Sequence, residues 1–279
     1  MRYWVRKNAA VPRRRQLAAQ IILDIASYDL ERRRKLWSTR ELARLLKVNR
    51  NTVSAVYRDL AGRGWVESRN GSGVYVRPLA DIVSHAWSCA GQQTALGPRD
   101  HVLVIEPDAE FRRILVDEIK EATCLPVSGV GAEGYLDPAV LANAVPVVMW
   151  YRADQLCAAL PPDKPCVLLR LGSARGVLAA QGLPPPDALV AVVSRWPLFL
   201  EYAFTILVAR GVDPDAISVR DARERGWQRG LGVYEVVFAD KVTAAHLPAD
   251  CRTIVFRAVH DCSLNELRSH VAGLQRKPS

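Results

Sequence analysis

Several signatures of enzymes and metalloproteins are missing from this chain. The five histidines and six cysteines form no CxxC pair and no spacing typical of a metal site. No GxSxG segment provides a nucleophile elbow, and the glycine-rich stretch at 128–134 lacks both a phosphate-loop lysine and a full GxGxxG pattern. The sequence therefore predicts no catalytic residue, no bound metal and no cofactor.

Long apolar runs are missing too. No run approaches the roughly 20 residues that cross a bilayer, and the N-terminal stretch is too charged and too interrupted for a secretory signal. The cysteines are scattered in apolar stretches such as "PCVLL", which is typical of reduced thiols in the core of a cytosolic protein. We therefore expect a cytoplasmic protein without a membrane partner.

The charge that is present is distributed unevenly. Residues 1–80 hold 18 Lys and Arg against 6 Asp and Glu, a net +12, whereas residues 81–279 hold 20 against 23, a net −3. A basic head on a slightly acidic body favours a polyanionic partner, with nucleic acid as the first candidate and an anionic membrane as the second. The length of 279 residues favours two domains and allows a sizeable core.

Apolar residues at helical spacing predict two helices in the head, over 14–28 and 38–47. Ser38 and Glu41 have the spacing of a capping box, which marks the start of the second helix. The expected inward residues are Leu17, Ala18, Ile21, Ile22 and Ile25 in the first helix, and Leu42, Leu45 and Leu46 in the second.

A third helix is expected over 51–61, with Asn49 as its N-cap. Its inward stripe would be Val53, Val56, Tyr57 and Leu60, and its outward face would carry Arg50, Asn51, Ser54, Ala55 and Arg58. Together with helix 38–47 and the tight turn between them, it forms a helix-turn-helix. Small, polar and basic outward residues suit the major groove of DNA.

Two short strands, "WVESR" and "GVYV", follow the third helix and are joined by the hairpin connection "NGSG". Arg69 and Arg77 flank this hairpin, while Gly71 and Gly73 allow the backbone to approach a phosphate closely. The hairpin is therefore predicted to be the wing of a winged helix.

The segment "STRELARLLKVNRNTVSAVYRDLAGRGWVESRNGSGVYV" resembles the winged helix of GntR-family bacterial transcription regulators, most closely the MocR/YtrA-like members. The resemblance covers about residues 10–78. It implies that Arg40, Arg50, Asn51, Thr52 and Ser54 touch DNA and that Gly71 lies at the wing tip. The complete set of candidate DNA-binding residues is Arg40, Asn49, Arg50, Asn51, Thr52, Ser54, Arg58, Arg69 and Gly71.

The segment departs from the family pattern in two places. "RRRKLWS" stands where "PG..LPS" is usual, and Asn49 replaces a common Ser or Thr, which bears on the choice of operator. MocR proteins also carry an aminotransferase-like domain with a lysine that binds pyridoxal phosphate. Residues 99–279 are too few for that fold, so this cofactor is not expected.

The expected organisation is a winged helix over 1–78, a linker over 79–98 and an α/β body over 99–279. In the body, near-continuous apolar strands alternate with helices in two successive series, which predicts parallel sheets covered on both faces. One helix of the second series is expected at "ERGWQRGL". The break "GLPPPDA" separates two lobes of about 99–181 and 188–279. The predicted fold class is thus an α+β winged helix-turn-helix followed by two small parallel-sheet α/β lobes.

Two resemblances compete for the body. "VLVIEPDAEFRRIL" is similar to the beginning of a receiver domain, with Glu106 and Asp108 near its acidic pair. Trp150 or Tyr151 stands where a receiver has its phospho-accepting Asp, and Arg170 where it has a Lys, which argues against phosphoryl transfer. The whole body alternatively resembles a two-lobed periplasmic-binding-type sensor, on the segment "VAVVSRWPLFLEYAFTILVARGVDPDAISV".

Ligands of open α/β sheets bind beyond the carboxyl ends of the strands. The candidate effector-binding residues at those ends are Ser194, Arg195, Asp221, Asp240 and Lys241. Arg195 and Lys241 would be counter-charges for a small anion. The alternative, that these are ordinary solvated loop charges, stays open.

The sequence thus predicts a sequence-specific transcription regulator, expected to be a repressor, that binds double-stranded DNA at an inverted repeat as a homodimer. Its body would sense a small-molecule effector or mediate dimerisation. Two alternatives remain: an enzyme-like body tethered to a DNA-binding head, and a body that serves only as a dimerisation or partner scaffold.

Overall fold

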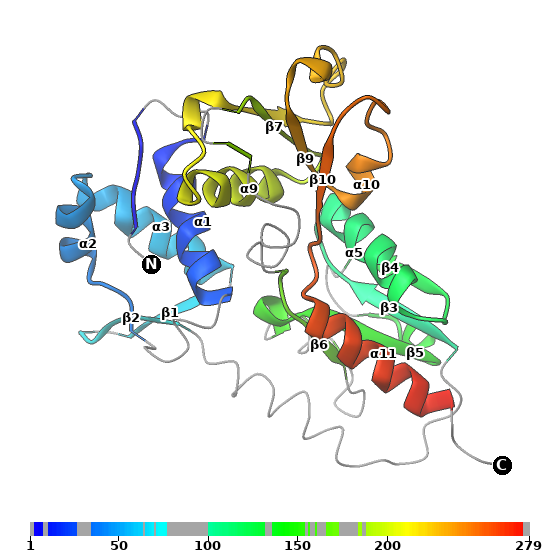
Figure 1. Cartoon of the computed structure of the whole chain (residues 1–279). Coiled ribbons are helices and arrows are strands. Elements are labelled where there is room, and N and C mark those ends of the chain that lie inside the picture. Colours follow the sequence, from blue (N-terminus) through cyan, green and yellow to red (C-terminus); the bar gives the residue numbers. More distant parts are fainter. Residues whose placement is uncertain are drawn as a thin grey trace. The chain divides into compact units, whose positions relative to one another are not determined.

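The computed structural model describes residues 3–7, 11–26, 35–63, 65–69, 71–76, 100–131, 136–153, 156, 160, 166–172, 184–185 and 188–275 (Figure 1). The expected linker over 79–98 lies outside the described residues, as does most of the "GLPPPDA" break. The chain divides into two units. Unit 1 is Met1–Arg77 with Ser173–Phe256, and unit 2 is Pro78–Gly172 with Arg257–Ser279.

The N-terminal part of unit 1 is a three-helix domain with an antiparallel hairpin. Its elements are α1 (Arg13–Ala26), α2 (Thr39–Leu46), α3 (Arg50–Gly62), β1 (Val66–Arg69) and β2 (Gly73–Val76). A bridge from Lys35 to Tyr75 adds a third short segment beside the hairpin. The expected inward stripes of the first and third helices are confirmed, because Leu17, Ile21 and Ile25 and also Val53, Val56, Tyr57 and Leu60 are buried.

The buried face of α2 differs from the expected one. Leu42 is buried, but Leu45 is 48% exposed, and Ala43 takes the inward place. Residues of a helix turn by about 100° each, so Leu42, Ala43 and Leu46 share one side and Leu45 falls outside it. The helix ends directly afterwards at Lys47, which has a left-handed φ of 52°.

Helix α1 is buried on several sides because it packs against α3 and also against α9 (Pro197–Ala209) of the same unit. Two glutamines of α1 hold the segment before it. Gln20 accepts a hydrogen bond from the Trp4 amide (3.0 Å) and donates one to the Trp4 carbonyl (2.7 Å). Gln16 makes the same pair with Arg6, at 2.9 and 3.2 Å. The two amides thus satisfy the backbone of an N-terminal segment that is not part of a sheet.

The other part of unit 1 is a four-stranded parallel sheet in the order β10-β9-β7-β8. Its strands are β7 (Val190–Ser194), β8 (Ile217–Asp221), β9 (Val236–Asp240) and β10 (Thr253–Phe256). Helix α9 covers β7 and β8, and the four-residue helix α10 (Lys241–Ala244) contacts β9 and β10. Because α9 lies between this sheet and α1, its sequence "PLFLEYAFTILVA" is apolar nearly all round.

The prediction of a helix at "ERGWQRGL" is wrong. The chain there forms turns and then a short 3-10 helix, Leu231–Val233. Gly226 and Gly230 have φ values of 76° and 65°, a left-handed conformation that an α-helix cannot contain. Leu231 and Trp227 from this loop pack against Ala191, Val193 and Val237 of the sheet.

Unit 2 contains the second parallel sheet, in the order β4-β3-β5-β6. Its strands are β3 (His101–Ile105), β4 (Val127–Val130), β5 (Ala144–Met149) and β6 (Val167–Leu169). Helix α5 (Ala109–Ala122) packs on β3 and β4, and α6 (Pro138–Leu141) contacts β5. One side of α5 is buried against the sheet and carries Phe111, Ile114, Leu115, Glu118 and Ile119.

The chain returns to unit 2 after β10, which differs from the expected lobe of 188–279. Helix α11 (Asp261–Gln275) packs against α5 and β6. Buried Glu118 of α5 accepts hydrogen bonds from the amides of Ala258 (2.7 Å) and Val259 (2.9 Å). These contacts explain the difference: the last helix finds its apolar and hydrogen-bonding partners on the first sheet of the body.

The two sheets have the same strand order. In each group the first strand lies between the second and the third, and the fourth lies beyond the third. The chain therefore turns one way after the first strand and the other way after the third. Ligands of open α/β sheets usually bind at the carboxyl ends of the two strands between which such a change of direction occurs. We call these places the β3–β5 edge in unit 2 and the β7–β9 edge in unit 1.

Candidate functional site

Helix α3 presents a polar face outward because its apolar stripe is buried against the domain. Asn49 caps the helix, and its side-chain oxygen accepts a hydrogen bond from the Asn51 amide at 2.8 Å. Arg50, Asn51 and Arg58 are exposed, and Thr52 and Ser54 are half-buried. The first turn of α3 thus offers a guanidinium and an amide at the helix end that usually enters the major groove.

The start of helix α2 is fixed by reciprocal hydrogen bonds between side chains and backbone. The capping box is formed: Ser38 Oγ accepts from the Glu41 amide (3.2 Å), and Glu41 Oε2 accepts from the Ser38 amide (3.1 Å). The pKa of Glu41 is lowered, chiefly by its hydrogen bonds to Ser38. Arg40, in the first turn of α2, is exposed.

The wing contains a cluster that sequence reasoning missed, formed by Lys35, Arg69 and Tyr75. The Arg69 guanidinium lies 4.6 Å from the centre of the Tyr75 ring, and Lys35 Nζ lies 5.8 Å from it. The hydroxyls of Tyr75 and Ser72 are 2.6 Å apart, and this hydrogen bond is the main cause that lowers the pKa of Tyr75. Sequence spacing gives no signal for the cluster, because Lys35 reaches Tyr75 only through the bridge between them.

The wing tip depends on glycine for a conformational reason. Gly71 has a φ of 71° and nothing within 4 Å of the place of a Cβ, so its backbone angle, and not crowding, favours glycine there. Arg69 Nε also donates to Glu67 Oε1 at 2.7 Å. The Arg69 side chain is 56% exposed and that of Glu67 is half-buried, so a phosphate can reach the guanidinium from the solvent and compete for it.

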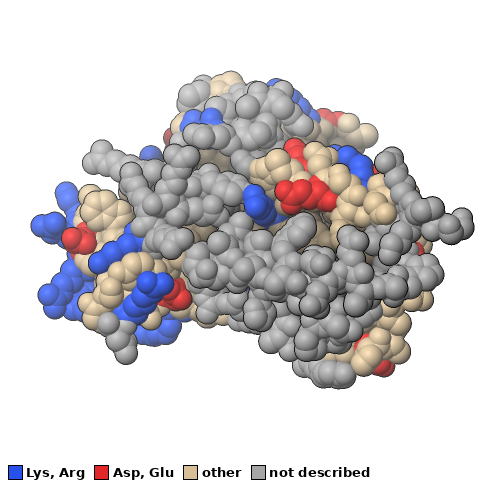
Figure 2. All heavy atoms as spheres, turned by 90° about the horizontal axis from the view of Figure 1, so that it is seen from below, with Lys and Arg blue, Asp and Glu red and all other residues tan. Residues whose placement is uncertain are grey.

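Exposed basic side chains are frequent on α2, α3 and the hairpin with its neighbouring bridge residue Lys35. Figure 2 shows Lys and Arg concentrated at the end of the view that holds the three-helix domain. The exposed basic residues from position 35 to the end of the hairpin are Lys35, Arg40, Arg44, Lys47, Arg50, Arg58 and Arg69. These residues make up the candidate nucleic-acid interface, and the DNA-contacting role of each residue stays a prediction.

Comparison with known families decides what this domain is. The family described as "Bacterial regulatory proteins, gntR family" matches residues 13–76, which are the helices and the hairpin just described. Residues 13–76 are a GntR-family helix-turn-helix domain. The antiparallel pairing of β1 with β2 is the wing that the family resemblance implied.

Two curated proteins are similar to the chain. One is the "Probable rhizopine catabolism regulatory protein MocR" of Rhizobium meliloti, 34% identical over 108 residues, which are 35% of this chain and 22% of that protein. The other is the "Uncharacterized HTH-type transcriptional regulator YhcF" of Bacillus subtilis (strain 168), 38% identical over 68 residues, 24% of this chain and 56% of that protein. The matches thus cover less than two thirds of either relative.

The β7–β9 edge, which follows the GntR-family domain within unit 1, brings the five expected effector residues to one side of a sheet. Ser194 and Asp240 are buried and bound to each other, with 2.6 Å between Ser194 Oγ and Asp240 Oδ2. Asp240 also accepts from the amide (2.8 Å) and the hydroxyl (2.6 Å) of Thr243. These two expected effector residues therefore hold the start of α10.

The charged residues of the same edge lie nearer the solvent. Asp221 accepts hydrogen bonds from the Arg223 side chain, which lower its pKa, and the charge of Arg195 lowers it further. Arg195 and Lys241 are half-buried at the ends of β7 and β9. Their role as counter-charges for an effector stays a prediction.

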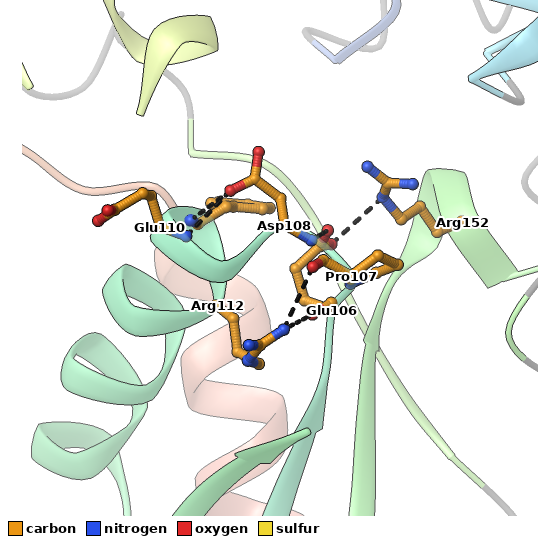
Figure 3. Close-up of polar contacts among 7 residues, drawn as sticks. Glu106, Pro107, Asp108, Glu110, Arg112 and Arg152 are labelled. Atoms are coloured by element: carbon orange, nitrogen blue, oxygen red, sulfur yellow. Dashed lines mark hydrogen bonds and ion pairs between the residues drawn. The ribbon is translucent and has the colours of Figure 1, made fainter. Parts of the chain in front are cut away.

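The β3–β5 edge holds a different set of groups, shown in Figure 3. Glu106 follows β3, is fully buried, and accepts a hydrogen bond from the Asp108 amide at 3.0 Å. Arg152, in the 3-10 helix after β5, has its Nε 3.3 Å from Glu106 Oε2. Burial raises the pKa of Glu106 in spite of the attraction of Arg152.

No helix in the described part of the chain is long and apolar enough to cross a membrane. Among the same residues, no group of three or more His, Cys, Asp or Glu side chains has the arrangement of a metal site.

Proposed function

We propose that the chain is a transcription regulator that reads operator DNA through α3 and its wing. The observation that supports this most is the division of α3 into two faces. Val53, Val56, Tyr57 and Leu60 are buried while Arg50, Asn51 and Arg58 are exposed. The helix is thus rigidly held, and its side chains toward the solvent are those that hydrogen-bond base edges and phosphates.

The chain is proposed to act as a homodimer on an inverted repeat. One helix-turn-helix reads only a few base pairs, and two-fold symmetry doubles the contact while matching a palindromic operator. Repression is the proposed output, because a dimer that covers a promoter excludes other proteins from it. Light scattering of the protein, alone and with operator DNA, should give the mass of two chains. A monomer in both samples would contradict the proposal.

The packing of α1 supports a coupling between the body and the DNA-binding domain. Helix α1 contacts both α3 and α9, and Arg15 Nε lies 3.3 Å from Glu201 Oε1 of α9. Helix α9 rests on β7 and β8, whose carboxyl ends carry Arg195 and Asp221. A ligand that moves this edge would thus displace α1. It would change DNA affinity only as far as it prefers one of the two arrangements.

The test begins with selection of DNA fragments retained by the purified chain, followed by affinity measurements on the selected operator. Arg50→Ala should weaken binding by about 1–3 kcal/mol and relax the preference at one base position per half-site. Arg69→Ala should weaken all sequences alike and reduce the slope of log K against log salt by about one.

Arg225→Ala is the matched control, because Arg225 is an exposed arginine of the body. It should bind as the unmodified chain does. Equal operator affinity for Arg50→Ala and for Arg225→Ala would refute the assignment of α3 as the reading helix.

A further inference from the structure

The β3–β5 edge contains a buried charge that the DNA-binding function does not use. Glu106 follows β3 and Arg152 follows β5, so the pair lies where the chain changes direction in the strand order of unit 2. An ionised carboxylate at zero exposure is costly, and such groups are normally well hydrogen-bonded. The residues around Glu106 indicate why a carboxylate is buried at this edge.

The contact between Glu106 and Arg152 is incomplete. Among the described residues, neither Glu106 Oε2 nor Arg152 Nε has a hydrogen-bond partner, although the two atoms are 3.3 Å apart. The charges attract, but the donor and the acceptor are poorly aligned. A pair whose only role was to close the sheet edge would gain from better alignment. The carboxylate therefore attracts the guanidinium by charge from one side without closing a hydrogen bond to it.

The Arg152 guanidinium shares a side-chain hydrogen bond with Tyr151, and its remaining donors point outward. Figure 3 shows the terminal nitrogens of the guanidinium facing away from Glu106, beyond the strand ends. The Arg152 side chain is 25% exposed, and it also contacts the ring of Tyr151, with 5.6 Å between guanidinium carbon and ring centre. A planar guanidinium fixed in this way is suited to bidentate binding of a carboxylate or a phosphate.

Asp108 restricts the choice of anion. Its Oδ1 caps α5 by accepting from the amides of Glu110 and Phe111, both at 3.0 Å. Figure 3 shows its other oxygen directed away from the helix, toward the same end of the strands as the Arg152 fork. A dianion such as phosphate would be repelled by Asp108 and Glu106. A molecule that carries both a negative and a positive group would be attracted by Arg152 and by Asp108.

We propose that the β3–β5 edge binds a small zwitterionic carboxylate of the amino-acid type, with its carboxylate on Arg152 and its ammonium group on Asp108. Glu106 is a positioning residue that holds Arg152. This ligand site belongs to unit 2 and does not depend on the proposed function, because ligand binding is measured without DNA. Failure of the operator experiments would therefore leave it standing.

The test is calorimetric titration of the full chain with each of the twenty standard amino acids. Acetate, succinate and inorganic phosphate serve as probes without an amine. At least one amino acid should bind, and at least tenfold more tightly than any of the three amine-free anions. Tighter binding of phosphate, or no binding of any amino acid at millimolar concentration, would overturn the proposal and leave a structural ion pair.

Two substitutions locate the site. Arg152→Lys keeps the charge but removes the fork, and should weaken binding at least tenfold. Asp108→Asn preserves the cap of α5, since Asn is as good an N-cap as Asp, and should abolish the preference for amine-bearing probes. Arg113→Lys, at an exposed arginine of α5, is the matched control and should bind normally. Unchanged affinity in Arg152→Lys would also overturn the proposal.

Discussion

The two polar edges of the body occupy the same topological place and solve the problem of burying a carboxylate differently. At the β7–β9 edge, Asp240 receives three hydrogen bonds, one from Ser194 and two from Thr243. At the β3–β5 edge, Glu106 receives one from the Asp108 amide and faces the poorly aligned Arg152. At the β7–β9 edge, neutral donors satisfy the buried carboxylate. At the β3–β5 edge, the buried carboxylate faces a charged guanidinium instead.

Strand order therefore sets the place where a ligand can bind, whereas the side chains at that place determine which ligand binds. Hydroxyl and amide donors satisfy an acidic side chain locally, so Asp240 serves to start α10. A guanidinium can satisfy one carboxylate and still offer further donors. The chemistry available to a ligand therefore differs between the edges, and substitutions at each edge should have effects of different size and kind.

The largest expected effect is on stability, at the β7–β9 edge. Asp240→Ala leaves Ser194 Oγ and both donors of Thr243 without their acceptor in a buried place. The expected loss is about 3 kcal/mol of unfolding free energy, because each buried donor left unpaired costs about 1–3 kcal/mol. Urea unfolding at neutral pH measures it.

Asp221→Ala is the matched control at the same edge. Its pair with Arg223 is partly exposed, and such pairs contribute at most about 1 kcal/mol. If the two alanine variants were equally stable, the description of this edge as closed by hydrogen bonds would not hold.

Much of this arrangement could be predicted from the sequence, because periodic apolar residues carry it. The alternation of apolar strands and helices in the body, the capping box at Ser38 and the cap at Asn49 follow from spacing and from capping chemistry. The helix-turn-helix follows for the same reason, since Val53, Val56 and Tyr57 can only face inward. A local sequence pattern predicts structure where a single interaction, such as burial or capping, determines the conformation.

The parts that could not be predicted depend on partners distant in sequence. The return of α11 to unit 2 rests on Glu118, some 140 residues from the amides that it binds. Gln16 and Gln20 look like surface residues until residues 3–6 are seen to lie against them. Arg152 follows a strand like any loop charge, and only the strand order places it beside Glu106.

The two edges should also bind ligands of different charge. The β7–β9 edge carries two cations, Arg195 and Lys241, so it should favour a compound with several negative charges. In a panel of sugar phosphates and tricarboxylates, joint replacement of both cations by alanine should weaken binding about tenfold, or about 1.4 kcal/mol. Arg152→Lys should leave such binding unchanged. Equal affinity in the double variant would remove this edge as an effector site.

The smallest expected effect is a pH dependence that distinguishes buried Glu106 from half-buried Asp221. Burial raises the pKa of Glu106 above the ordinary value of 4.5, so the folded chain holds this proton more tightly than the unfolded chain. The contribution of Glu106 to stability is then greatest below that value and is lost as the pH rises through the raised pKa. Glu106→Gln cannot ionise and should lack this slope.

Thermal unfolding between pH 4.5 and pH 8 at constant ionic strength measures the difference between the parent chain and Glu106→Gln. Relative to the variant, the parent should lose stability as the pH rises. Asp221→Asn is the control from the other edge. Hydrogen bonds from Arg223 lower the pKa of Asp221 below the ordinary 3.8, so its contribution is complete above that value and disappears only in stronger acid. The Asp221→Asn difference should therefore stay constant over this range. A rising difference for Glu106 would mean that Arg152 stabilises the carboxylate more than burial penalises it, and the β3–β5 edge would then be closed by its ion pair.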